Sequence, residues 1–273
     1  MQISIITIST KHLKKNYFGE RTKEINMLRF KALKFIFVLI TLNISYSQDN
    51  EIGLIFGGTN YIGDVGPTTY ISPFNNQNLS ENQKNSMGYA FGIIYKKNLN
   101  NRIILRSSAR ILKINSSDFW KGSADYRKQR GFYFTNNIEE VELGIEFNFL
   151  DFDISSKTNE FTPYVSSGLS YFRFDNLFYP NNQNEAVSYG KRNDFAIPIT
   201  VGLKLKPMKK FVLSFEISAH HSFTENLDGS YPRFDESTLY SQGSFGGNLS
   251  QDWYVFTGIS LTYIFGNYEC YCP

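Results

Sequence analysis

Apolar and polar side chains alternate in one segment after another once the chain passes Gln48. Period-two alternation is typical of a β-strand, because successive side chains of a strand point to opposite faces of the sheet. The pattern is fullest near the end of the chain, where one face of the segment carries Trp253, Val255, Thr257, Ile259, Leu261, Tyr263 and Phe265. We predict about eight strands, over residues 49–59, 88–97, 102–114, 136–149, 161–174, 194–206, 210–222 and 252–266.

Most of these segments have at least the 9 to 11 or so residues that a tilted transmembrane β-strand needs. One face of each is apolar and suited to lipid. In a bilayer every backbone N–H and C=O group must find a partner within the protein, and a closed sheet provides one. The sequence therefore predicts an all-β fold, an antiparallel up-and-down transmembrane β-barrel of about eight strands. Aromatic residues near strand ends are expected to form interfacial girdles: Tyr89, Tyr95, Tyr164, Phe172, Phe174, Trp253 and Tyr254.

The opposite, polar face of the predicted strands carries charges of both signs. Two arginines lie in the third segment, three glutamates in its neighbour and one in the seventh: Arg106, Arg110, Glu140, Glu142, Glu146 and Glu216. An eight-stranded barrel is just wide enough inside for side chains to fill it, so an open pore is not expected. Unpaired buried charges cost several kcal/mol each, so we expect these groups to pair in the lumen. The alternative is a soluble sandwich whose polar face meets water.

The lengths of the predicted links suggest an orientation. Short or moderate links, at residues 98–101, 151–160 and 207–210, alternate with long ones at 60–87, 115–135, 175–193 and 222–251. Outer-membrane barrels have short periplasmic turns and long outward loops, and an even number of strands returns both termini to one side. We expect an outer-membrane location with periplasmic termini.

A secretory signal peptide is predicted at residues 27–47. It has a basic head, an apolar run from Phe35 to Leu42 and a small-x-small exit at residues 45–47. The apolar run is too short to span a bilayer, so cleavage is expected rather than anchoring. The alternative is a buried N-terminal helix. The predicted organisation is an upstream extension from an early start (1–26), the signal peptide, the barrel (48–266) and a periplasmic tail (267–273).

Removal of this leader changes the charge of the protein. The whole chain has 28 basic and 25 acidic residues, but residues 1–47 hold eight of the basic and two of the acidic ones, which leaves 20 against 23. A nucleic-acid partner needs a concentrated basic face and is not expected. The expected surroundings are outer-membrane lipid.

Candidate chemistry is sparse, and we predict no cofactor and no enzymatic activity. His220 and Ser222 share a face of the seventh segment with Glu216, so an outer-membrane hydrolase is kept as an alternative hypothesis. A glycine-rich string resembles a phosphate cradle, but no helical pattern follows it. Its glycines are expected to let the chain leave the barrel and fold over the mouth; the string includes Gly57, Gly58, Asn60, Tyr61, Gly63, Asp64, Gly66 and Pro67.

The two cysteines of the chain, Cys270 and Cys272, lie in the tail. A Cys-x-Cys pair closes only a small strained ring, and two thiolates are too few for a structural zinc site. In the oxidising periplasm a disulfide to another protein is one possibility, and a frayed tail without such a bond is the other.

Several blocks together resemble the DUF6089 or PorG-like family of outer-membrane barrels of Bacteroidota. They are residues 57–68, 145–149, 161–164 followed by Gly168, 195–198, and the ending from Asp252 to Gly258 with the Cys270-Tyr271-Cys272 tail. The resemblance implies a component of the type IX secretion machinery that attaches to the periplasmic ring of the PorK lipoprotein and PorN, while a distinct larger barrel conducts cargo. Family members usually carry an Asp-rich string where this chain has residues 224–230, which affects any contact made by that loop.

The expected function is therefore a non-catalytic anchor in a protein secretion complex. The alternative is a small binding or uptake barrel whose outward loops hold a glycan, a lipid or another hydrophobic ligand. Loss of secretion in a deletion strain would separate the anchor from both other hypotheses.

Overall fold

The computed structural model describes residues 50–70, 88–156, 159–232, 244–246 and 251–266. Eight strands form one sheet. They are β1 (Asn50–Ile62), β2 (Gly88–Asn98), β3 (Ile103–Ser117), β4 (Tyr133–Asn148), β5 (Glu160–Phe178), β6 (Val187–Met208), β7 (Phe211–Ser222) and β8 (Trp253–Phe265), with a short helix α2 (Asp125–Arg130) between β3 and β4. Within these ranges, no helix is both long enough and apolar enough to cross a bilayer.

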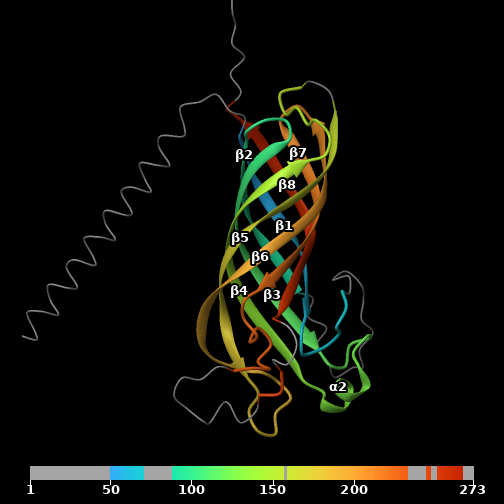
Figure 1. Cartoon of the computed structure of the whole chain (residues 1–273), viewed down its shortest axis with the longest axis vertical. Helices are drawn as coiled ribbons and strands as arrows, with labels where there is room; N and C mark the ends of the chain where they lie inside the picture. Colours follow the sequence, from blue (N-terminus) through green and yellow to red (C-terminus); the bar gives the residue numbers. More distant parts are fainter. Residues whose placement is uncertain (1–49, 71–87, 157–158, 233–243, 247–250, 267–273) are drawn as a thin grey trace, which may run out of the picture. The chain divides into compact units, whose positions relative to one another are not determined.

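The sheet closes into a barrel. Each strand pairs antiparallel with the next, and β8 returns to pair with β1 from Asn50↔Phe265 to Ile62↔Trp253. The start of β1 and the end of β8 therefore lie at the same end of the barrel (Figure 1). That end, called the short-turn end below, also holds the links 99–102, 149–159 and 209–210. The long-loop end holds α2, the links 118–132 and 179–186, and the described residues that follow β1 and β7, 63–70 and 223–232. The predicted fold is confirmed.

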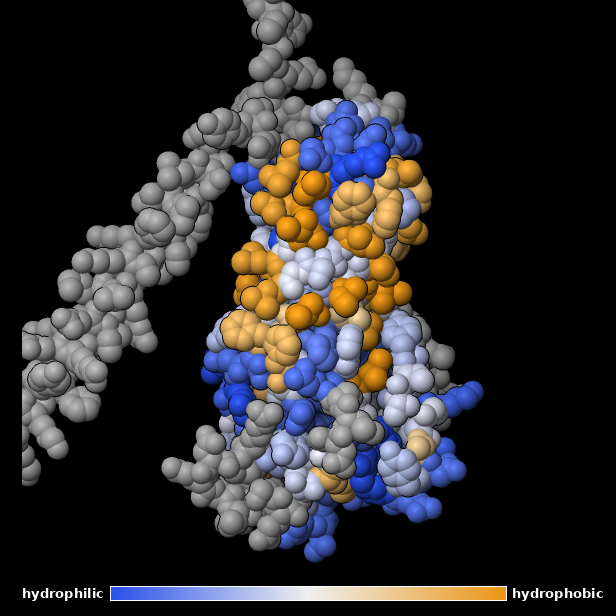
Figure 2. Space-filling model, in the orientation of Figure 1, coloured by the Kyte–Doolittle hydropathy of each residue, from blue (hydrophilic) through white to orange (hydrophobic). Residues whose placement is uncertain are grey.

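The outside of the barrel is apolar along its middle. Burial alternates residue by residue, so that in β4 Val141, Leu143 and Ile145 are more than half exposed while their neighbours are buried or half-buried. Figure 2 shows the resulting apolar band between two polar ends. Soluble monomers rarely expose apolar patches beyond a few hundred Å². The band instead has the form that lipid requires of a spanning barrel, so the soluble sandwich is wrong.

The inside of the barrel has an apolar cluster towards each end. At the long-loop end, buried aromatic and aliphatic side chains pack together, including Ile55, Tyr61, Leu112, Ile114, Phe134, Ile138, Phe172, Phe174, Tyr254 and Phe256. At the short-turn end, the link after β4 folds inward and places Phe152 and Ile154 against Val212 and Ile264. The polar part of the lumen lies between these two clusters.

Five strands extend three or more residues beyond their predicted ends, and β5 and β6 extend furthest. β5 continues to Phe178 and β6 begins at Val187, so their ladder runs past the apolar band, with a register shift at Asn176 and Leu177. The link between them is only residues 179–186, shorter than the link 149–159 at the other end, so the predicted strict alternation of short and long links is wrong. Alternation could not reveal the extension, because outside the apolar band neither face of a strand needs apolar residues.

The predicted girdle is also partly wrong. Tyr89 and Tyr95 are exposed on the exterior as expected, but four other aromatics are almost completely buried inside the barrel: Tyr164, Phe172, Phe174 and Tyr254. Their positions along the strands have lumen-facing parity, and parity decides orientation regardless of the amphipathic character of the ring. The predicted signal peptide and the tail with Cys270 and Cys272 lie outside the described residues.

Candidate functional site

Charged side chains fill the middle of the lumen. Ten buried groups project inward from the strands, with five basic residues, Lys96, Arg106, Arg110, Lys204 and Lys206, and five glutamates, Glu51, Glu140, Glu142, Glu146 and Glu216. They come from β1, β2, β3, β4, β6 and β7. We call this set the lumen charge network. The network holds equal numbers of basic and acidic residues, which lowers the free-energy cost of burying charge in the lumen.

Glu146 joins the part of the network nearest the short-turn end. Its Oε2 lies 3.0 Å from the Lys96 ammonium, its Oε1 accepts a hydrogen bond from Lys204, and Arg106 Nη1 lies 3.8 Å away. Lys204 also donates to Asn148 over 3.3 Å. One carboxylate from β4 thereby ties together cations from β2, β3 and β6, so it connects strands that are not neighbours in the sheet.

Arg106 crosses the centre of the lumen. Its Nη1 and Nη2 each donate to Glu216 on β7 over 3.2 Å, and its Nε lies 3.5 Å from Glu142 on β4. The Tyr164 hydroxyl donates to the same Glu216 carboxylate over 2.6 Å. The paired-fork geometry of arginine with carboxylate is the strongest common form of ion pair, and here it links opposite walls.

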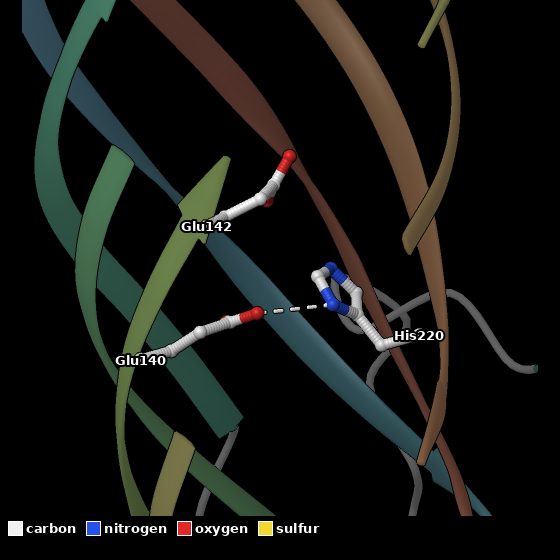
Figure 3. A group of neighbouring side chains, drawn as sticks. All are labelled: Glu140, Glu142 and His220. Atoms are coloured by element: carbon white, nitrogen blue, oxygen red, sulfur yellow. Dashed lines mark ion pairs between the residues drawn. The ribbon is translucent and has the colours of Figure 1, made fainter. Parts of the chain in front are cut away.

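Arg110 organises the third part of the network, next to the apolar cluster of the long-loop end. Figure 3 shows Glu140 and Glu142 of β4 directed towards His220 of β7. His220 Nδ1 lies 3.1 Å from Glu140, and its Nε2 lies 3.3 Å from Arg110 Nη2. The same Nη2 lies 3.3 Å from Glu140 and donates to Glu142. Because arginine only donates, a hydrogen bond between these two groups requires His220 Nε2 to accept.

Glu140, Glu142 and His220 have the chemistry of a metal site, since their ligand atoms lie within 4.8 Å of one another. The position between them is filled by the guanidinium of Arg110, which contacts all three side chains. The geometry therefore uses an internal cation from β3 for the charge compensation that a metal ion would supply.

Glycines stand beside the largest lumen groups. Gly92 pairs with Arg110, Gly144 pairs with Arg106, and Gly202 pairs with both Tyr164 and Glu216. A Cβ at Gly202 would lie 2.6 Å from two ring atoms of Tyr164. A hydrogen in place of a side chain leaves the room that these long side chains occupy.

The hydrolase hypothesis rested on Ser222 near His220. The Ser222 hydroxyl donates instead to the backbone carbonyls of Asp252 and Thr224, over 2.7 and 3.1 Å. His220 is bonded to Ser218 Oγ at 3.0 Å, stacks on Tyr254 with 4.5 Å between ring centres, and is fully buried. The described contacts of His220 are those of a group fixed within the lumen charge network.

The glycine-rich string ends in a loop, residues 63–66, that other loops of the long-loop end hold in place. Arg127 of α2 donates to the carbonyls of Gly63 and Gly66 over 2.7 and 2.8 Å, and Arg130 donates to that of Asp64 over 2.8 Å. We call this loop and its partners the cap. Gly66 has φ +90°, and a Cβ there would lie 1.9 Å from Ser116 Oγ, so only glycine fits.

Three buried aspartates complete the cap by accepting backbone N–H groups. Asp118 accepts from Gly66 over 2.8 Å and from Phe132 over 3.0 Å, and it also pairs with Arg130. Asp228 accepts from Val65 over 3.1 Å and from Ser230 over 2.8 Å, and Asp252 from Leu227 over 2.8 Å. Each carboxylate thus connects segments that the chain separates widely. The cap is a hydrogen-bonded closure of the long-loop end.

Two of these carboxyls are shifted towards their neutral form. Burial raises the pKa of Asp228, and burial together with the nearby Asp228 raises the pKa of Asp252 well above its usual value. The Tyr61 hydroxyl lies 2.5 Å from Asp252 and belongs to the same polar group. A carboxyl with a raised folded-state pKa stabilises the fold at low pH, and this contribution is lost as the pH rises through that pKa.

The structure places all six sequence-predicted charged residues in one network. Sequence reasoning did not single out Lys96, Lys204 or Glu51, and it assigned Tyr164 to the girdle, although each has lumen-facing parity in its strand. It also missed the cap partners Asp118, Arg127 and Asp228, because loops have no periodicity from which to read a contact. The predicted tail cysteines, Cys270 and Cys272, lie outside the described residues.

The model of DUF6089, a domain of unknown function, matches residues 30–273. The chain belongs to the DUF6089 family. No curated protein matches this DUF6089 chain.

Several solved structures are similar to this DUF6089 barrel at low identity. The outer membrane protein OprG of Pseudomonas aeruginosa matches with a TM-score of 0.43 and 9% identity over 80% of this chain and 96% of OprG. Ail of Yersinia pestis, solved with the heparin analogue sucrose octasulfate, matches with 0.40 and 11% over 80% and 99%. The N-terminal barrel domain of Pseudomonas aeruginosa OprF matches with 0.38 and 14% over 80% and 97%. The fold assignment rests on strand pairing, and these scores carry no functional argument.

Proposed function

We propose that the protein is a non-catalytic outer-membrane barrel that anchors a periplasmic assembly, as the PorG-like component of the type IX secretion machinery does. The observation that carries this proposal is the filled lumen. Charges from β2, β3, β4, β6 and β7 pair with one another inside the barrel, and apolar clusters lie on both sides of them. Such an interior suits a rigid membrane support rather than a conduit for protein.

The outer-membrane location is supported by the apolar band and the closed sheet. Only helices and closed barrels satisfy all backbone groups in hydrocarbon, and antiparallel barrels with an even number of strands are the form typical of bacterial outer membranes. The predicted signal peptide would deliver the chain there. With both termini in the periplasm, as the link lengths predict, the short-turn end faces the periplasm and the cap faces outward.

The short-turn end is the surface that we propose for the periplasmic partner. Among its described residues, Leu99, Leu150 and Met208 are 44, 50 and 65% exposed, although they lie in or beside turns. The tail with Cys270 and Cys272 follows β8 in the sequence. An apolar rim is a suitable contact for ring proteins of the PorK and PorN type.

The proposal is tested by deleting the gene and measuring secreted protein and ring recovery. The deletion should reduce secretion, and wild type expressed from a plasmid should restore it. Leu150→Glu places a charge on the proposed contact surface and should lower recovery of the ring proteins from detergent extracts. Tyr126→Glu, a matched change of an exposed residue in α2 at the other end, should leave recovery unchanged.

Two results would count against the anchor. The first is normal secretion in the deletion strain, which would favour the binding or uptake barrel. The second is full recovery of the barrel without any ring component from wild-type membranes. Barrel folding in each variant is checked independently by its heat-dependent shift in gel mobility.

A further inference from the structure

A groove of about 690 Å³ runs over the outside of the barrel from β2 to β6. Its apolar lining comes from Phe91, Ile93, Ala109, Ile111, Val141 and Tyr171. These residues belong to two adjacent cross-strand rows near the long-loop end of the apolar band, as the pairs Phe91↔Ile111 and Val141↔Tyr171 show. The groove is therefore a depression in the lipid-facing surface.

Ala109 is the reason for the depression. It stands between Ile93 and Val141 in one row, and its methyl group is much shorter than either neighbour. The lumen-facing residues beneath the groove include Gly92, which also adds no bulk. A hollow between larger apolar side chains has the width and polarity that a hydrocarbon chain fills well.

The rim of the groove towards the long-loop end is polar and carries two cations. Glu139, Arg173 and Asn193 lie side by side and continue the row of Phe91 and Ile111 across β4, β5 and β6, and Lys191 lies one row further out. Lys191 contacts Glu139 at 3.3 Å, whereas Arg173 makes no ion pair with any described residue. The guanidinium of Arg173 therefore stands beside Glu139 in the sheet without pairing to it, at the polar side of the groove.

A second exterior groove gives an internal comparison. It measures about 510 Å³ and lies over β6, β7 and β8, lined by Val201, Leu203, Phe215, Ile217, Thr257 and Ile259. Its exposed lining side chains carry no charge. Apolar hollows alone therefore occur elsewhere on this barrel, and the cationic rim distinguishes the groove at Ala109.

We propose that the groove at Ala109 binds a phosphorylated lipid of the leaflet at the long-loop end. Arg173 and Lys191 hold the phosphate, Asn193 donates a hydrogen bond, and one acyl chain lies in the hollow beside Ala109. Arginine and lysine favour phosphate through charge-assisted hydrogen bonds, and an apolar chain next to them adds area that a free anion cannot use. This inference rests on the membrane location but not on the anchoring role.

The test is native mass spectrometry of the purified barrel released from detergent in the presence of equal amounts of lipid A and phosphatidylcholine. Wild type should retain lipid A preferentially. The double variant Arg173→Gln, Lys191→Gln should retain about tenfold less, which corresponds to the loss of one strong charge-assisted contact. Ala109→Phe, which fills the hollow without changing charge, should also lower retention.

Two further variants test the direction of the change in lipid A retention and its specificity. Glu139→Gln releases Lys191 from its ion pair and should increase lipid A retention. Lys210→Gln removes an exposed lysine at the short-turn end and should have no effect. Inorganic phosphate at equal concentration should not displace the lipid.

Equal retention of lipid A and phosphatidylcholine by wild type would overturn the proposal, as would an equal loss in Lys210→Gln. Displacement by inorganic phosphate would show anion binding without a lipid site. The groove variants at Ala109, Glu139, Arg173 and Lys191 keep the short-turn end intact, so secretion assays on the same strains separate this proposal from the anchoring role.

Discussion

Glu146→Gln is the most informative perturbation of the lumen. The substitution keeps the size of the side chain but removes its charge and replaces one acceptor oxygen with an NH2 donor. The fully buried ammonium groups of Lys96 and Lys204 then lose their shared carboxylate, and Arg106 loses one of its partners. Removing one member of a buried ion pair costs about 3–5 kcal/mol. Because two lysines depend on Glu146, we expect a loss of about 4 kcal/mol or more in the free energy of unfolding.

Glu139→Gln is the matched control, since it lies on the same strand with its side chain on the opposite face. Its pair with Lys191 joins side chains that are 55 and 42% exposed, and such pairs contribute about 0–1 kcal/mol. Unfolding is measured by urea titration of barrels in lipid vesicles, followed by tryptophan fluorescence. A double variant Glu146→Gln, Lys96→Met should recover part of the loss. The reasoning is refuted if the two glutamines destabilise the barrel equally.

Three further substitutions test the cap and the packing of the lumen. Gly66→Ala should cost about 1–2 kcal/mol of cap stability, because a positive φ disfavours a side chain, and should speed hydrogen exchange at residues 63–66. The raised pKa values of Asp228 and Asp252 predict slower corrected exchange of the cap at pH 5 than at pH 8, and Asp252→Asn should remove most of this difference. Gly202→Ala should cost about 1–3 kcal/mol in urea titration, because its methyl group would displace the Tyr164 ring from Glu216.

Gly190→Ala serves as the control for both glycine variants, since a Cβ there meets no atom within 4 Å. A similar response of Gly190→Ala and Gly202→Ala would show that lumen packing is looser than described. Cap exchange that is faster at pH 5 than at pH 8 would contradict the sign expected from buried, neutral carboxyls.

Strand number and pairing were predictable because two environments imposed them. Lipid on one side and a packed lumen on the other require residues such as Val141 and Glu142 to differ in polarity. This difference appears in the sequence as an alternation with a period of two residues. The first residues of β6, from Val187 to Asn193, lie beyond the apolar band and are largely exposed on both faces. Period-two alternation therefore identified the strands but could not show where β6 begins.

Many residues of the lumen charge network could be predicted from the sequence, but most of the contacts between them could not. Parity placed Arg110 and Glu140 on one face, and antiparallel pairing brought them together. The contacts across the barrel, such as Arg106 with Glu216, depend on side-chain reach between strands that are not adjacent. The cap was less accessible still, because Asp118 and Asp228 act on loop backbone, and no sequence period reports on that.

The ionic interior has a physical rationale in a membrane. A barrel surrounded by hydrocarbon gains little by moving apolar side chains from lipid to its core, so polar contacts and close packing must select the register. Ion pairs that span the lumen, such as Arg106 with Glu216, join walls that backbone hydrogen bonds do not connect. A one-residue slip of β4 would turn Glu140, Glu142 and Glu146 towards lipid.

A lumen that is filled by paired charges and closed by the cap leaves ions no path through the barrel, and single-channel recording measures such a path. Purified barrels are reconstituted in planar bilayers, with insertion verified separately and a porin as the positive control. Wild type is expected to show no steady ionic conductance across a wide voltage range. Reproducible wild-type conductance steps of defined size would contradict it, because ions would then have a continuous aqueous path past Arg106 and Arg110.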